Sequence, residues 1–245
     1  MCGRFTLTDP DQDLAVQFNL PEVPDIKPRY NIAPTQPVAT VRIAPDSLLG
    51  ESTPVREMAF LHWGLIPFWA KDPSIGGRMI NARSETAADK PAFRAAFRRR
   101  RCLVVADGFY EWQKVDGGKQ PFYIRLQGGE PFAFAGLWEF WKKPDAEDGN
   151  GGRAIESCTL LTTEPNDLLR AVHNRMPVIL HPRDYDLWLD PGVQDPELLQ
   201  PLLGPYPSEV MDAYAVSRWV NSPANDDPRC IEPLEQSAGN RLPGL

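Results

Sequence analysis

Proline is the feature that most restricts the fold of this chain. It occupies 26 of the 245 positions and recurs along the whole length, about twice its average usage of roughly 5%. Proline lacks a backbone N–H, and its ring clashes with the preceding turn of a helix, so long helices do not form across such a sequence. We therefore expect few helices, all of them short.

Runs rich in β-branched and aromatic residues between these prolines predict strands. They lie at residues 38–43, 55–61, 102–106, 122–126, 132–138, 157–163 and 178–180. Apolar residues at helical spacing predict short helices, at residues 11–20, 91–100, 166–171, 182–189 and 195–203, with Pro91 as the first residue of the second. Strand and helix do not alternate regularly, which disfavours a Rossmann-type sheet. The expected fold is α+β, with a curved, mainly antiparallel sheet and short flanking helices.

A length of 245 residues and a hydrophobic content of 42% suit one compact domain. We place this domain at residues 1–235. Residues 145–152 (DAEDGNGG) read as a flexible acidic loop within it, and residues 236–245 as a polar tail that frays.

Neither a membrane span nor a metal centre is expected. No apolar run approaches the roughly 18 residues of a spanning helix, and Phe5 follows the first residues without a signal-peptide core. We therefore expect a chain that stays inside the cell and has no membrane partner. The four cysteines form no CxxC pair and only three histidines accompany them, so we expect free thiols, no metal and no cofactor.

The net charge of −7 argues against a general polyanion binder, but the charge is unevenly distributed. Residues 1–125 carry 17 basic and 14 acidic residues, whereas residues 126–245 carry 9 and 19. The densest basic run consists of Arg94 and the four arginines at 98–101. It is either a solvated helix end or a contact for an anionic ligand.

Cys2 would become the N-terminal residue if Met1 were removed. Its α-amine, with a pKa of about 7.7–8.0, and its thiol, at about 8.5, would then be two nucleophiles on one residue. An aldehyde could condense with the amine, after which the thiol could close a thiazolidine ring. A Met-Cys start also occurs by chance, so other residues must decide.

Further candidates lie in separate segments of the chain. Asn81 and Arg83 are two apart in an extended segment and can reach one ligand. Glu111 is flanked by aromatic residues, which would raise its pKa toward neutrality, unless it is a surface residue of a hairpin. His173 follows a helix in a loop, where a histidine is either solvated or a proton carrier. The aromatics of residues 63–69 (WGLIPFW) form either core or stacking platforms.

Seven motifs occur in order from the first residue to residue 222. They are MCGRF, NIAPTQ (31–36), WGLIPFWAKD (63–72), NARSET (81–86), CLVVADGFYEW (102–112), HNRMP (173–177) and VSRWVNS (216–222). Together they resemble the SOS response-associated peptidase (SRAP) family of abasic-site processing proteins. Each motif is several residues long, so chance explains the set poorly.

This resemblance implies a monomeric DNA-damage enzyme that binds single-stranded DNA and crosslinks Cys2 to the aldehyde of an abasic site, in the cytoplasm of a prokaryote or the nucleus of a eukaryote. It implies catalytic roles for Cys2, Asn81, Glu111 and His173, with Asn81 positioning the sugar or the Cys2 backbone. It implies DNA contacts from Arg4, Pro34, Trp69, Arg83 and Trp112. It also implies that Met1 is removed, either by the protein itself or by an aminopeptidase. Two alternatives stay open, a peptidase or amidohydrolase with an N-terminal nucleophile and a non-covalent reader of single-stranded or modified DNA.

Overall fold

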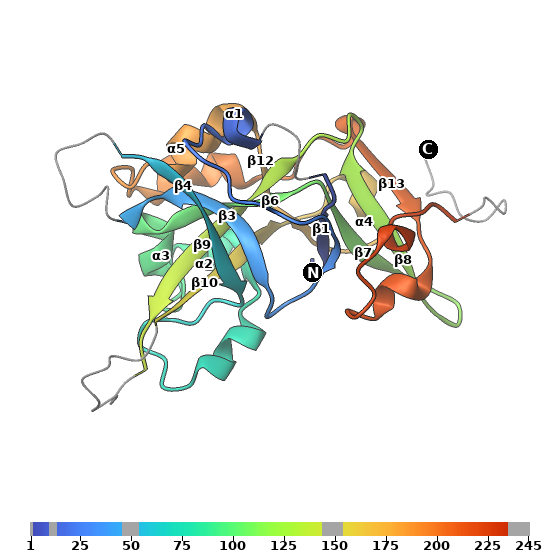
Figure 1. Cartoon of the computed structure of the whole chain (residues 1–245), viewed down its shortest axis with the longest axis horizontal. Coiled ribbons are helices and arrows are strands. Elements are labelled where there is room, and N and C mark those ends of the chain that lie inside the picture. The colour runs from blue at the N-terminus through green and yellow to red at the C-terminus, as the bar shows by residue number, and fades with distance from the viewer. Residues whose placement is uncertain (1, 10–13, 46–53, 144–153, 235–245) are drawn as a thin grey trace.

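The structure, a computed structural model, describes residues 2–9, 14–45, 54–143 and 154–234 (Figure 1). The predicted acidic loop at 145–152 and the tail at 236–245 lie outside the described residues. The strands are β1 (Phe5–Leu7), β2 (Arg29–Ile32), β3 (Pro37–Ile43), β4 (Arg56–Trp63), β5 (Asn81–Arg83), β6 (Arg101–Ala106), β7 (Gly108–Val115), β8 (Gly118–Leu126), β9 (Phe132–Trp141), β10 (Ile155–Thr163), β11 (Met176–Pro177), β12 (Ile179–Leu180) and β13 (Met211–Ala215). The helices are α1 (Leu14–Phe18), α2 (Ser84–Ala87), α3 (Arg94–Arg99), α4 (Asp167–Arg170), α5 (Tyr185–Leu189) and α6 (Pro196–Leu199).

The larger sheet closes into a barrel. Its strands follow the order β11-β10-β4-β3-β6-β9-β12, and β10 pairs with β9 as well as with β4. The ring β4-β3-β6-β9-β10 therefore returns to its starting strand. Most pairings are antiparallel, but β10 runs parallel to β4 and to β5.

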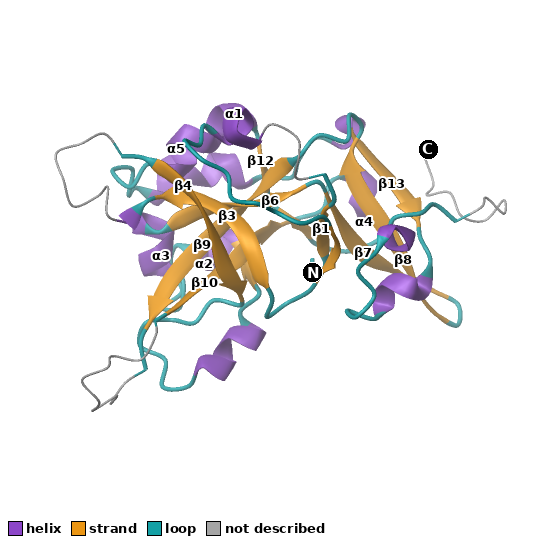
Figure 2. Ribbon diagram, viewed as in Figure 1, coloured by secondary structure: helices purple, strands orange, loops and turns teal. Residues whose placement is uncertain are grey.

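The smaller sheet lies beside this barrel and has the order β13-β8-β7-β1-β2. Figure 2 shows it on the opposite side of the molecule from α3 and α5, which cover the barrel. The Phe134 ring on β9 meets the rings of Phe5 on β1 and Phe109 on β7 edge-on, with centroids 5.7 and 5.9 Å apart. These contacts bury large apolar areas at the seam and join the two sheets into one core.

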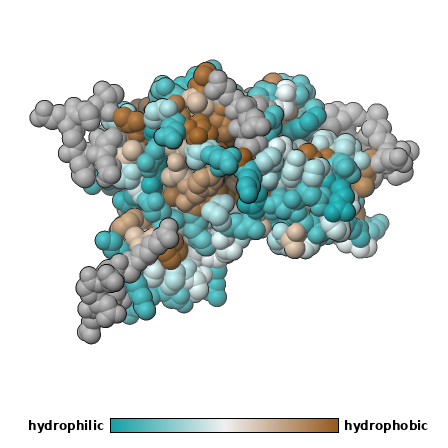
Figure 3. Space-filling model, viewed as in Figure 1, coloured by the Kyte–Doolittle hydropathy of each residue, from teal (hydrophilic) through white to brown (hydrophobic). Residues whose placement is uncertain are grey.

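The two sides of the molecule differ in surface character. In the view of Figure 3, apolar residues gather over the barrel, whereas the surface over the smaller sheet is mostly hydrophilic. No helix among the described residues is long and apolar enough to cross a membrane.

The α+β class, the mainly antiparallel pairing and the predicted strands are confirmed. The sequence did not indicate β1, β2, β11 or β13, which are two to five residues long, nor the eight-residue β7 that carries Glu111. The prediction of Pro91 as the first residue of a helix is wrong: the helix begins at Arg94, because the backbone of Phe93, at φ −121° and ψ −26°, departs from helical values. The predicted helix at 195–203 is divided into α6 and a 3₁₀ turn, where Pro201 lacks an N–H for the helical ladder.

Candidate active site

Cys2 is held against the barrel by Asn81. The Asn81 Nδ2 atom donates a hydrogen bond of 2.8 Å to the Cys2 carbonyl oxygen. Asn81 begins β5, whose backbone is aligned beside Leu160 of β10. The Asn81 amide thus connects Cys2, which lies before the smaller sheet, to β5 of the larger sheet. The Asn81 Oδ1 atom is buried and has no partner among the described residues.

The Cys2 thiol is fully buried. Burial, followed by the nearby charge of Glu111, raises the pKa of this thiol well above its usual range. Its Sγ atom lies 3.7 Å from the Arg4 carbonyl oxygen, a weak hydrogen bond. The thiol is therefore protonated at neutral pH.

Glu111 lies on β7 opposite Phe122 of β8, and only 2% of its surface is exposed. Removal from water disfavours the charged carboxylate and raises its pKa to about 7. The expectation of a raised pKa is confirmed, and the alternative of a surface glutamate is wrong. A carboxyl group with this pKa can both give and accept a proton near neutrality.

His173 is half-buried in the loop after α4, and burial lowers the pKa of its ring. The backbone N–H of Arg175 donates to its Nδ1 atom at 3.1 Å. Nδ1 also lies 3.3 Å from the Arg175 carbonyl oxygen, so this nitrogen contacts both polar groups of the Arg175 backbone. Gln113 of β7 donates to the Ala171 carbonyl oxygen at 3.0 Å, which places this loop beside the strand that carries Glu111.

The His173 loop is braced by an ion pair. Both terminal nitrogens of Arg175 donate to the Glu85 carboxylate of α2, at 2.6 and 2.9 Å. This two-point contact fixes the plane of the guanidinium group as well as its position.

A hollow of about 420 Å³, which we call the basic hollow, is lined by Arg4, Trp112, Lys119, Arg218 and Asn221. Asn221 Oδ1 accepts from the Trp112 indole at 2.8 Å. None of the described residues that line it is acidic. Its charges and indole suit a phosphate beside a base.

Much of the Arg4 side chain is engaged within the protein. Its Nη1 atom donates to Asn31 Oδ1 and to the Val220 carbonyl oxygen, both at 2.8 Å, and Nη2 donates to the Asn221 carbonyl oxygen at 3.2 Å. Arg4 therefore also joins the start of β1 to the segment around residue 220.

The remaining predicted contacts lie on other loops. Trp69 is 49% exposed and, with Lys71 and Arg78, lines a second hollow of about 420 Å³, which we call the tryptophan hollow. Arg83 is exposed at the end of β5, and Pro34 is half-exposed in a turn. The residue 63–69 cluster is divided, since Trp63 is buried whereas Phe68 and Trp69 are exposed.

Lys119 and Arg218 were missed by the sequence reasoning, and so was the pairing of Arg175 with Glu85. Arg218 lies within the VSRWVNS motif, but its meeting with Lys119 depends on how β8 is placed. All four cysteines are free and buried. Among the described residues, no three His, Cys, Asp or Glu side chains are grouped as a metal site needs.

Comparison with known proteins identifies the family. The family model described as SOS response associated peptidase (SRAP) matches residues 1–223. The chain belongs to the SRAP family. Its relative YoqW of Bacillus subtilis, an abasic site processing protein, is 45% identical over 238 residues, 95% of this chain and 99% of YoqW. The abasic site processing protein HMCES of Xenopus tropicalis is 32% identical over 72% of this chain and 57% of its own length.

Solved structures agree with this SRAP assignment. A protein from Bacteroides thetaiotaomicron superposes with a TM-score of 0.80 at 26% identity, covering 96% of this chain and all of that one. A protein from Bordetella bronchiseptica superposes with a TM-score of 0.70 at 26% identity over 88% of this chain.

Proposed function

We propose that this SRAP protein processes abasic sites in single-stranded DNA by linking Cys2 covalently to the sugar aldehyde after removal of Met1. Its relatives YoqW and HMCES are abasic site processing proteins, which supports the abasic substrate. The main support for the chemistry is that Cys2, Asn81 and Glu111 lie together. Asn81 binds the Cys2 carbonyl oxygen, and the Glu111 charge is close enough to raise the pKa of the Cys2 thiol.

The reaction is a condensation without a change in oxidation state. The Cys2 amine attacks C1′ of the ring-opened sugar, and the resulting carbinolamine loses water to give an imine. The Sγ atom then adds to the imine carbon, and the thiol proton is transferred to the nitrogen, which closes a thiazolidine ring. Because the thiol is protonated at neutral pH, we expect the amine to react first and the thiol to close the ring.

Glu111 and His173 divide the proton transfers in this proposal. Glu111, with a pKa of about 7, donates a proton to the departing water and accepts the thiol proton. His173 acts on the sugar hydroxyls and ring opening. The free Oδ1 of Asn81 can accept a hydrogen bond from the sugar while Nδ2 holds Cys2.

The DNA strand lies across the basic hollow and the exposed aromatic residues in this proposal. Arg4 and Arg83 contact phosphates on either side of the lesion, as do Lys119 and Arg218. Trp112, Trp69 and Pro34 pack against neighbouring bases, since every base offers a face for stacking. The positive lining of the basic hollow supports the phosphate contacts.

A thiol-dependent peptidase is the second candidate, because the matched family is described as a peptidase. A buried thiol beside a carboxyl group of pKa about 7 also suits cleavage of the Met1–Cys2 bond. Such self-processing would precede capture of the DNA and does not compete with it. Turnover of added peptides without DNA would instead favour a general peptidase.

Intact-mass analysis after mixing with an abasic oligonucleotide tests the proposal. We expect an adduct, lighter by one water than the sum of its parts, that survives denaturation. Cys2→Ser should lose the stable adduct and keep most of its affinity for single-stranded DNA, because arginines and aromatic residues supply the binding.

Two controls separate the amine from the thiol and the aldehyde. A chain with an uncleaved N-terminal extension keeps the thiol but lacks the free amine, and should form no adduct. A tetrahydrofuran analogue of the abasic site cannot open to an aldehyde and should also give none. A stable, unreduced adduct at wild-type yield in Cys2→Ser would refute the proposal.

A further inference from the structure

A third hollow, of about 580 Å³, lies where α3 meets the turn at Phe68 and the end of β9. We call it the arginine hollow. It is lined by Phe68, Arg94, Ala95, Arg98, Arg99, Arg100, Glu139, Phe140 and Gln194. Its described lining residues include four arginines and one glutamate, a net charge of +3 in a chain whose net charge is −7.

Three of these arginines are free. Arg94, Arg98 and Arg99 are exposed and form no ion pair or side-chain hydrogen bond with a described residue. Arg100 donates to Glu139 at 2.7 Å. Arg101, the last residue of the run, is different, because its buried guanidinium donates to the carbonyl oxygens of Phe97 and Arg98 at 2.7 and 2.8 Å.

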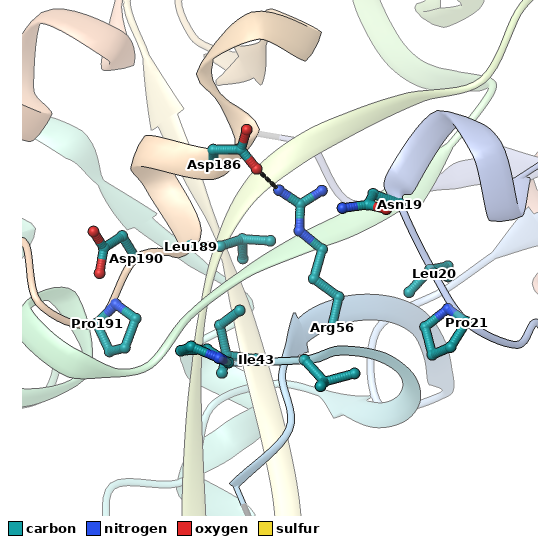
Figure 4. Close-up of a pocket in the computed structure, with 11 residues that line it drawn as sticks. Asn19, Leu20, Pro21, Ile43, Arg56, Asp186, Leu189, Asp190 and Pro191 are labelled. Atoms are coloured by element: carbon teal, nitrogen blue, oxygen red, sulfur yellow. Dashed lines mark hydrogen bonds and ion pairs between the residues drawn. The ribbon is translucent and has the colours of Figure 1, made fainter. Parts of the chain in front are cut away.

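A hollow between α1 and α5 provides a contrast. Arg56 lines that cavity of about 590 Å³, but it donates to the Asp186 carboxylate (Figure 4) and also to the Phe18 carbonyl oxygen. Its charge is satisfied within the protein. The free arginines of α3 have no such internal role.

Helix stability does not account for all of these charges. Arg98 and Arg99 lie in the last turn of α3, where a cation interacts favourably with the helix dipole. Arg94 is its first residue, where a cation is unfavourable, and Arg94 and Arg98 are four apart, a spacing at which like charges repel. An external anion would relieve this repulsion.

Exposed rings accompany these charges. Phe68 and Phe140 are 59% and 41% exposed. An acidic peptide would be recognised by charge alone and gives no reason for exposed apolar rings. Free arginines interleaved with aromatic rings are instead the pattern that holds the phosphates and bases of single-stranded nucleic acid.

The arginine hollow is connected to the candidate active site through one loop. Phe68 lines the arginine hollow, and the adjacent Trp69 lines the tryptophan hollow with Lys71 and Arg78. The same loop then leads to Asn81, which holds Cys2. In the view of Figure 1, this loop, drawn in teal, runs below α3 and the N-terminus.

We propose that the arginine hollow is a second binding site for single-stranded nucleic acid, independent of the lesion, which holds the strand on one side of the abasic site. This proposal rests on the proposed function in one respect, the path of the strand from the abasic site to the arginine hollow. The second site would bind undamaged DNA as well. Arg94, Arg98 and Arg99 contact phosphates, and Phe68 and Phe140 stack on bases.

The test measures the affinity of the full chain for undamaged oligothymidylate of about 20 nucleotides by fluorescence anisotropy across a range of salt concentrations. Each phosphate contact contributes about 0.7 to the slope of log K against log salt for single strands. Arg94→Ala/Arg98→Ala should therefore reduce the slope by about 1.4. Between 50 and 200 mM salt, the affinity of this variant should then fall by a factor about sevenfold smaller than that of the wild type. Arg94→Lys/Arg98→Lys should retain the wild-type slope, because it keeps the charge.

The matched control is Arg170→Ala/Arg183→Ala. Both arginines are largely exposed, but each lies beside its own aspartate, at 3.4 and 3.8 Å, so this variant should keep the wild-type slope. Phe68→Ala should weaken oligothymidylate binding by about fivefold or more, the typical contribution of one stacked base, and leave inorganic polyphosphate binding unchanged.

The proposal fails if Arg94→Ala/Arg98→Ala keeps the wild-type slope while its melting curve is unchanged. It also fails if that variant loses affinity for a polyglutamate peptide but binds the oligonucleotide as tightly as wild type, since the partner would then be an acidic protein. An abasic strand of about six nucleotides is too short to span both sites. On this strand, Arg94→Ala/Arg98→Ala should form the adduct at the wild-type rate. Loss of the adduct in the wild-type chain would overturn the proposed function but not this site.

Discussion

Glu111 shows how one buried carboxyl group affects both stability and chemistry. It is almost completely buried on β7, and burial raises its pKa to about 7 from the ordinary 4.5. In the unfolded chain the carboxyl loses its proton near pH 4.5, while the folded chain keeps it until about pH 7. Unfolding therefore releases a proton between these pH values, so rising pH favours the unfolded state.

We expect Glu111→Gln to gain stability relative to wild type as pH rises. One pKa unit corresponds to about 1.4 kcal/mol, so the difference should grow by about 3 kcal/mol from pH 4.5 to 7 and then stay constant. Urea denaturation at a series of pH values measures it. Glu85→Gln is the control of opposite sign, because the Arg175 hydrogen bonds lower the pKa of Glu85 below the ordinary 4.5. Its variant should lose stability relative to wild type as pH rises toward 4.5, and the difference should then stay constant where that of Glu111→Gln changes. A pH-independent difference for Glu111→Gln would show that its carboxyl is not held protonated.

The division of work between Glu111 and His173 gives a kinetic prediction. Removing one general acid or base typically slows a reaction about 10²- to 10⁴-fold, so Glu111→Gln and His173→Ala should both slow adduct formation by at least the lower figure, with binding nearly unchanged. If Glu111 also protonates the thiazolidine for ring opening, Glu111→Gln should trap a preformed adduct, whereas His173→Ala should release it normally. Time courses of crosslinking and of transfer to a competing abasic strand measure both. Wild-type kinetics in the two variants would contradict the assignment.

At the scale of elements, β1 is held in place by Asp107, at the corner between β6 and β7. Its carboxylate accepts hydrogen bonds from the Thr6 hydroxyl at 2.5 Å, the Thr8 hydroxyl at 2.7 Å, and the backbone N–H groups of Thr8 and Asp9, the latter at 3.2 Å. Since β1 begins three residues after Cys2, this corner also restricts the position of Cys2.

We expect Asp107→Asn to destabilise the fold by about 2–4 kcal/mol, because its NH₂ group would face donors that need an acceptor. Adduct yield should fall as β1 loosens, and the amides of β1 should exchange hydrogen faster than those of the barrel. Asp195→Asn is the matched control: Asp195 caps α6 by accepting from the Glu197 N–H at 3.0 Å, and asparagine caps equally well. Equal stability of the two variants would mean that the Asp107 contacts contribute little.

Sequence reasoning predicted those features of the fold and site that depend on nearby residues. Runs of β-branched and aromatic residues indicated the barrel strands, and the aromatic neighbours of Glu111 indicated its raised pKa. The sequence analysis gave Asp107 no role of its own outside the motif at residues 102–112, because its partners lie about a hundred residues earlier in the chain. Lys119 and Arg218 are separated by a similar distance and meet only after β8 is placed. Contacts of this kind have no local pattern.

Prolines also limited what could be predicted about helices. They predicted short helices, and each α-helix among the described residues has four to six residues. Helix boundaries were less certain, as at Pro91, because a proline tolerated at a helix start is equally compatible with the turn before it.

At the scale of the whole molecule, the net charge of −7 and the proposed DNA site place opposite demands on the protein. Long-range repulsion between exposed charges is screened beyond about 10 Å at 0.1 M salt. Positive charge is concentrated where it acts at short range, in the basic hollow with its three cations and in the arginine hollow. In the proposed function, these local contacts determine binding, and the net charge acts on solubility.

We expect affinity for undamaged single-stranded DNA to fall steeply with salt despite this negative net charge. At about 0.7 per phosphate contact, Lys119 and Arg218 alone predict a slope of about −1.4 for log K against log salt, and further contacts make it steeper. Anisotropy titrations of the full chain, between low and physiological ionic strength, measure the slope. Lys119→Ala/Arg218→Ala should lose about 1.4 of it, and because both side chains are exposed, its melting temperature should stay close to wild type. A flat salt response in the wild-type chain would show that phosphate contacts do not drive binding, and the basic hollow would then need another ligand.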